Sequence, residues 1–211
     1  QKCGLGMMVT QDQLGLLSNT YADLMYAYRL KTSETGVLSV GLQARIEYAR
    51  FNWNKAKSIS PTDNNLQNEN ENLTKPNFGV GAYYKDKNFF FGFSVPQLLE
   101  STLYRSSYED LPSLHRFRTY YLMTGAELAL SPSVDFMPGV LVSYIANAPL
   151  QAEINAKLVF SKTILVGASY RVGSSVDGLV GIQLTKQLML GLAYDYSISK
   201  LRKENIGSFE A

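Results

Sequence analysis

The chain has 211 residues, which is enough for one domain with a full core or for one mid-sized barrel. Lysine and arginine (20) nearly balance aspartate and glutamate (18), and the net charge of +2 without a basic run gives no indication of nucleic-acid binding. The mean hydropathy of −0.10 argues against a helical membrane protein, and no window approaches the ~20 apolar residues that a spanning helix needs.

Cys3 is the only cysteine, which excludes a disulfide framework and a cysteine-based zinc site. The first residues do not read as a signal peptide, and the given sequence already opens as a strand-like stretch at residues 4–9. It stops at residues 207–211, just inside what reads as another strand. We therefore expect a fragment that lacks the N-terminal part and most of the last strand of the intact protein.

Most of the chain alternates apolar and polar residues in segments of similar length, which predicts β-strands. In residues 151–160, for example, Glu153 and Lys157 share one face while Ile154 and Leu158 share the other. In chain order, the expected strands are 4–10, 18–30, 36–50, 76–86, 88–96, 117–131, 135–146, 149–161, 163–173, 178–185, 187–198 and a stub from 207.

The two faces of these strands differ in a way that favours a membrane barrel over a soluble sandwich. The apolar face is continuous and bulky, whereas the other face is rich in glycine, serine and alanine with isolated charges, as suits a crowded polar lumen. We expect these charges to form a structural network of ion pairs, with a pore lining or a docking place for a partner's tail as the alternative. The charges expected to face the lumen are Arg45, Glu127, Glu153, Lys157, Arg171 and Asp195.

The connections between the expected strands alternate in length. Short turns on one side and longer loops on the other are typical of outer-membrane barrels, whose short turns face the periplasm. The long connections, expected to be extracellular loops, are approximately 51–75, 97–116 and 199–206. The sequence therefore predicts an all-β fold: one transmembrane antiparallel up-and-down β-barrel domain over residues 1–211, with roughly 14 strands when intact and about 12 represented here.

No residue constellation indicates catalysis or cofactor binding. His115 is the only histidine, and it lies in an expected loop without a nucleophile or metal ligand at matching spacing. The acidic stretch 63–71 offers oxygen ligands but lacks the spacing of an EF-hand, so a solvated loop is favoured over a calcium site. We expect a protein that is not an enzyme and that binds no cofactor or metal.

Several short motifs resemble the PorP/SprF family in their order and spacing over about residues 20–211. Each motif is weak alone, and together they are fairly specific. Arg118–Leu122 is similar to an Arg-His-Tyr-Tyr-Leu run of that family, with Thr119 where a histidine is usual, so no role of that histidine is carried over. The other matching runs are Pro76–Tyr84, Phe93–Leu99, Ala148–Asn155, Ile164–Arg171, Ala193–Tyr196 and Gly207–Glu210.

The resemblance implies an outer-membrane protein of the type IX secretion system of Bacteroidetes. Members are tied to export or surface attachment of large proteins with a particular class of C-terminal domain, including gliding adhesins. The implied partners are outer-membrane lipid, a secreted substrate with such a domain, and other components of the secretion system. The family offers no catalytic motif to carry over.

Two functions follow as hypotheses. The first is an anchor or receptor that binds a secreted surface protein through its C-terminal domain or supports its export, using the long loops or the lumen. The alternative is a passive outer-membrane porin or solute channel, for which about 14 strands could leave room. The expected contact residues for a partner are Tyr104, Tyr108, Phe117, Asp63, Glu69 and Glu71.

Overall fold

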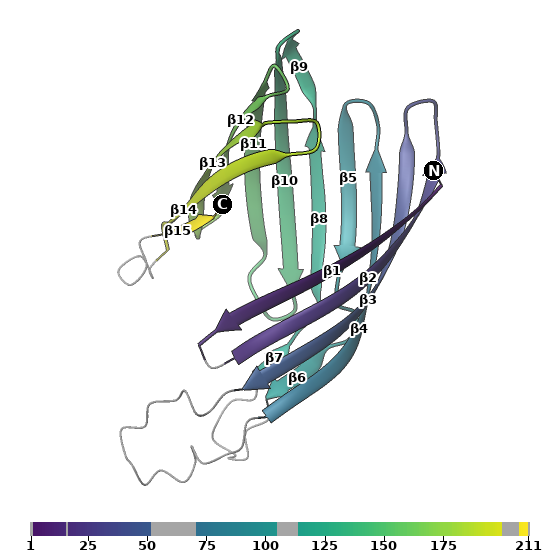
Figure 1. Cartoon of the computed structure of the whole chain (residues 1–211), viewed down its shortest axis with the longest axis vertical. Coiled ribbons are helices and arrows are strands. Elements are labelled where there is room, and N and C mark those ends of the chain that lie inside the picture. The colour runs from purple at the N-terminus through teal and green to yellow at the C-terminus, as the bar shows by residue number, and fades with distance from the viewer. Residues whose placement is uncertain (1, 16, 52–70, 105–113, 200–206, 211) are drawn as a thin grey trace. The chain divides into compact units, whose positions relative to one another are not determined.

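The structure is a computed structural model of the chain, and it describes residues 2–15, 17–51, 71–104, 114–199 and 207–210 (Figure 1). Among these residues, none forms a helix long and apolar enough to cross a membrane. The strands are β1 (Cys3–Leu14), β2 (Leu17–Lys31), β3 (Val37–Phe51), β4 (Glu71–Lys85), β5 (Phe89–Val95), β6 (Ser101–Tyr104), β7 (Leu114–Arg116), β8 (Thr119–Ala126), β9 (Leu128–Ser131), β10 (Val134–Ile145), β11 (Gln151–Phe160), β12 (Ile164–Arg171), β13 (Ser175–Gln183), β14 (Met189–Ser197) and β15 (Ser208–Glu210).

The strands pair mainly with their neighbours in the sequence. A 13-stranded sheet has the order β1-β2-β3-β4-β5-β8-β10-β11-β12-β13-β14-β15, with β9 also paired to β10, while β6 and β7 form a separate two-stranded sheet. The predicted all-β antiparallel fold is confirmed, and each expected strand appears. The expected strand 117–131 is divided into β8 and β9 because the strand is interrupted at Glu127.

The segment 97–116, expected to be a loop, contains β6 and β7, which pair with each other around Thr102 and His115. These strands have only four and three residues, too few to show an alternation in the sequence. The other expected long loops fall largely on residues 52–70 and 200–206, which lie outside the described part of the chain.

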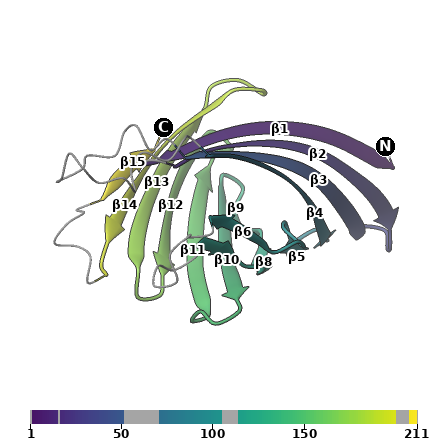
Figure 2. The same cartoon turned by 90° about the horizontal axis from the view of Figure 1, so that it is seen from below.

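The chain divides into two compact units, which we describe separately. The first comprises Gln1–Leu30, Ser39–Ala82 and Ser94–Thr119, and the second comprises Lys31–Leu38, Tyr83–Phe93 and Tyr120–Ala211. In the first, β1 and β2 pair without a break from Cys3 opposite Tyr28 to Leu14 opposite Leu17. In the second, β10 to β14 form consecutive antiparallel pairs and lie side by side in both views (Figures 1 and 2).

Burial in the sheet is the reverse of that in a soluble protein. Large apolar side chains on alternate positions are exposed, for example Leu42 (57%), Ile46 (58%) and Leu192 (60%). Among the described residues only Ala49 and Val95 are buried hydrophobic side chains, whereas five polar or charged residues are buried. We call the first surface the apolar face and the opposite surface the polar face. A continuous exposed apolar face of this kind requires a non-aqueous neighbour.

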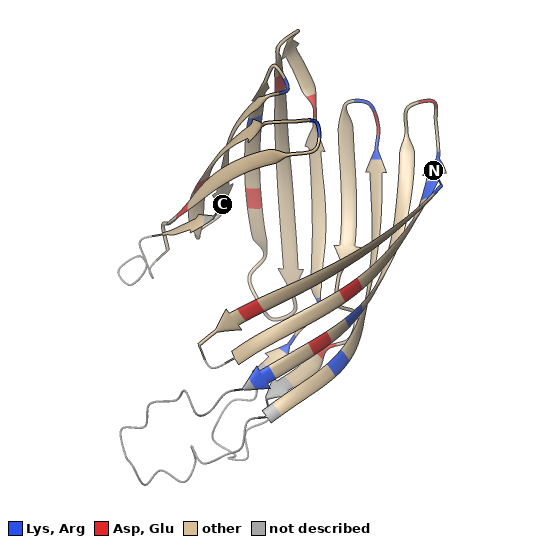
Figure 3. Ribbon diagram, viewed as in Figure 1, with Lys and Arg blue, Asp and Glu red and all other residues tan. Residues whose placement is uncertain are grey.

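Charged residues are sparse along the strands. Figure 3 shows most lysine, arginine, aspartate and glutamate residues at turns and strand ends, with isolated ones inside strands. Those inside β2, β3 and β11 to β14 alternate with exposed apolar neighbours, and they therefore lie on the polar face.

Candidate functional site

A charge pair lies on the polar face of the first unit. Arg45 in β3 donates through Nε and Nη2 to both carboxylate oxygens of Asp23 in β2, at 2.6 and 2.8 Å. Gln43 donates a third hydrogen bond to Asp23 at 2.7 Å, and the Asp23 side chain has no solvent exposure. The planar guanidinium matches the carboxylate with two parallel hydrogen bonds, so this pair fixes β2 against β3.

A second pair fastens the β6–β7 hairpin to the same polar face. Arg116, the last residue of β7, donates Nη1 to Glu47 Oε2 in β3 and Nη2 to the Tyr21 hydroxyl in β2, the latter at 3.1 Å. The guanidinium groups of Arg45 and Arg116 also lie 4.9 and 5.6 Å from the centre of the Tyr21 ring, within the range of cation–π attraction. The charged network therefore joins β2, β3 and β7.

The residues that lead into the hairpin are held against β4. Asn77 accepts a hydrogen bond from Leu99 N at 3.1 Å and donates one to Leu99 O at 2.8 Å. Lys75 donates to the carbonyl of Thr102. A Cβ added at Gly79 would lie 2.6 Å from Pro96 O, so the absence of a side chain there lets the Pro96 backbone approach β4. Residues 96–102 thus cross the polar face instead of extending away from the strand ends.

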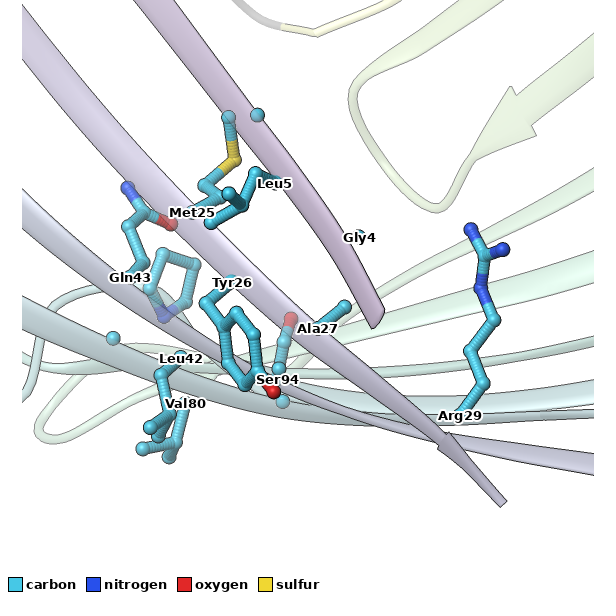
Figure 4. A pocket seen from close by; sticks show the side chains of 15 residues that line it. Gly4, Leu5, Met25, Tyr26, Ala27, Arg29, Leu42, Gln43, Val80 and Ser94 are labelled. Atoms are coloured by element: carbon cyan, nitrogen blue, oxygen red, sulfur yellow. The ribbon is translucent and has the colours of Figure 1, made fainter. Parts of the chain in front are cut away.

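A shallow hollow of about 470 Å³ lies in the wall formed by β1 to β4 (Figure 4). Five of its lining residues are glycines, and the labelled side chains come from both faces of the strands. The hollow results from the thinness of the wall where side chains are missing. The glycine residues are Gly4, Gly6, Gly41, Gly79 and Gly81.

A polar hollow of about 300 Å³ lies on the polar face of the second unit, along β11 to β14. Arg171 donates Nε and Nη2 to Glu153 Oε2, at 3.2 and 3.1 Å, from directly opposite positions in β12 and β11. Ser169 donates to Asp177 Oδ2 at 2.6 Å, and Asp195 is directly opposite Asp177 in the β13–β14 pair. All five side chains line this hollow.

Two further charge contacts lie at the turns of the second unit. Lys85 and Glu127 are 3.7 Å apart, with side chains 57% and 44% exposed. Asp86 accepts hydrogen bonds from Thr35 Oγ1, Lys87 N and Tyr84 Oη, which joins the turn before β3 to the turn after β4. The hydrogen bond from Thr35, followed by that from Lys87 N, holds the pKa of Asp86 below its ordinary value.

The expected lumenal charges occupy different settings. Arg45 lies in the first unit and is paired with Asp23. In the second unit, Glu153 and Arg171 form an ion pair, Lys157 and Asp195 line the polar hollow, and Glu127 lies at the break between β8 and β9. The sequence reasoning assigned no role to the partner residues Asp23, Glu47 and Arg116. The alternation of polar and apolar residues shows that Asp23 and Glu47 lie on the polar face. Their ion pairs could not be found from it, because they depend on how the strands are arranged next to one another.

The expected contact residues for a partner are only partly described. Tyr104 ends β6, Glu71 begins β4, and Phe117 is 43% exposed with its ring 6.2 Å from that of His115. His115 Nδ1 lies 3.1 Å from Thr102 Oγ1, a contact within the β6–β7 hairpin. Asp63, Glu69 and Tyr108 lie outside the described residues.

These clusters consist of ion pairs and hydrogen bonds between side chains of neighbouring strands. Within the described residues, no group of three or more histidine, cysteine, aspartate or glutamate side chains could hold a metal ion.

A family model described as type IX secretion system membrane protein PorP/SprF matches residues 1–211. The chain belongs to the PorP/SprF family. The family resemblance of the sequence motifs is thus confirmed over the whole chain, while no curated protein shows significant similarity to it.

Membership of the PorP/SprF family explains the arrangement of the two faces. The protein is an outer-membrane component of the type IX secretion system, and its fold is the all-β antiparallel sheet of an outer-membrane β-barrel protein. Lipid then supplies the non-aqueous neighbour that the apolar face requires. The polar face carries the ion pairs and the β6–β7 hairpin.

Proposed function

We propose that this PorP/SprF protein is a non-enzymatic anchor for a secreted surface protein, such as a gliding adhesin. It binds the C-terminal domain of that protein on the polar face, or supports its export from there. The strands serve as a rigid membrane platform, because each is fixed to its neighbours by a continuous hydrogen-bonded register.

The observation that supports this proposal best is the position of the β6–β7 hairpin. Arg116 of β7 bonds Glu47, and Lys75 bonds the Thr102 carbonyl of β6, so both strands of the hairpin are held against the polar face. Asn77 holds Leu99, just before the hairpin. In a passive channel the polar face should be left clear for solute, whereas here a folded element occupies it. A surface with a structured element and satisfied ion pairs suits the recognition of one partner.

The test combines capture and conductance on the full chain in lipid bilayers. The bait is the C-terminal domain of a type IX substrate encoded in the same genome, with a secreted protein that lacks such a domain as the control. We expect retention of the substrate domain, no retention of the control, and no steady current from the protein alone. A steady open-pore current without retention of the domain would support a porin instead.

A variant of the hairpin contact makes the test specific. Arg116→Gln weakens the attachment of the hairpin, and Lys85→Gln removes a charge from an exposed pair elsewhere in the wall. We expect weaker retention or a new current with Arg116→Gln and neither change with Lys85→Gln. Equal behaviour of the two variants would show that the hairpin has no part in binding.

A further inference from the structure

We draw no further inference here: the strongest candidate, the row of small residues Ala156, Ala168 and Gly178 across β11 to β13 on the apolar face, which ends at a hollow of about 490 Å³ lined by Gly178, carries none, because nothing in the structure shows what covers it.

Discussion

Replacing Arg116 with alanine should detach the β6–β7 hairpin from the polar face. The substitution removes the donor to Glu47 Oε2, the hydrogen bond to the Tyr21 hydroxyl and the cation–π contact with the Tyr21 ring. The Glu47 side chain is 4% exposed, so its carboxylate would remain buried without its main partner. The cost therefore comes mainly from the unpaired charge that is left behind.

The expected cost is about 3 kcal/mol, at the low end for breaking a buried ion pair, because the Arg116 side chain is still 18% exposed. The matched control is Lys85→Ala, which removes one partner of an exposed 3.7 Å pair and should cost below about 1 kcal/mol. Adding Glu47→Gln to Arg116→Ala should recover about 1–2 kcal/mol, because a buried neutral amide costs less than a buried carboxylate.

Hydrogen–deuterium exchange of the β7 amides measures the local opening of the hairpin. Urea unfolding in lipid vesicles measures the stability of the whole protein. A loss of 3 kcal/mol that falls on the hairpin alone corresponds to roughly a 100-fold loss of protection at the β7 amides. Urea unfolding shows whether the loss extends to the whole sheet. If Arg116→Ala changes neither quantity more than Lys85→Ala does, the hairpin is not held by this contact and our reasoning is wrong.

Three further predictions test other parts of the structure. Gly79→Ala should displace the Pro96 backbone, whose oxygen would lie 2.6 Å from the new Cβ, and should cost about 1–3 kcal/mol in urea unfolding; an unchanged stability would contradict the close approach. Leu192→Arg, at a position 60% exposed on the apolar face, should destabilise the protein in vesicles by about 2–4 kcal/mol at the bilayer midplane, and a cost near zero would mean that this position does not face lipid. The NMR titration midpoint of Asp86 should lie below 3.8, and Thr35→Val should raise it; an unmoved midpoint would exclude the hydrogen bond as the cause.

The sign of the Asp86 effect follows from its lowered pKa. The folded protein favours the ionised carboxylate, so the contribution of Asp86 to stability is fully present above the ordinary value of 3.8. It is lost as the pH falls through the lower pKa of the folded state. The turns joined through Thr35 should therefore loosen only in acid and should be unaffected by changes between pH 5 and 8.

The wall of the sheet could be predicted from the sequence because alternation is a local signal. The segment 151–160 alternates from Gln151 to Leu158, and β11 occupies residues 151–160. The interruption at Glu127 was not predicted, because the only signal near it is Gly125, and a single glycine inside a strand indicates a possible bulge without fixing where the strand breaks. The prediction of one continuous strand over 117–131 was therefore wrong, although β8 and β9 both lie within those bounds.

The β6–β7 hairpin could not be predicted, because its position depends on contacts between residues distant in the sequence. Arg116 reaches Glu47 and Tyr21 across 69 and 95 residues. Such contacts leave no periodic pattern, and the segment reads locally as a polar loop. The facing carboxylates Asp177 and Asp195 were missed as a pair for a related reason, since their proximity depends on the register of β13 against β14.

Site-specific photo-crosslinking in cells of the source bacterium tests the central claim most directly. A photoreactive residue is placed at Asn155 or Ser169 on the polar face, and at Ile154 or Val166 on the apolar face. We predict that the polar-face positions form adducts with a secreted protein, identified by mass spectrometry through its type IX C-terminal domain, and that the apolar-face positions do not. Adducts of that protein from the apolar face alone, or none from either face, would contradict the account.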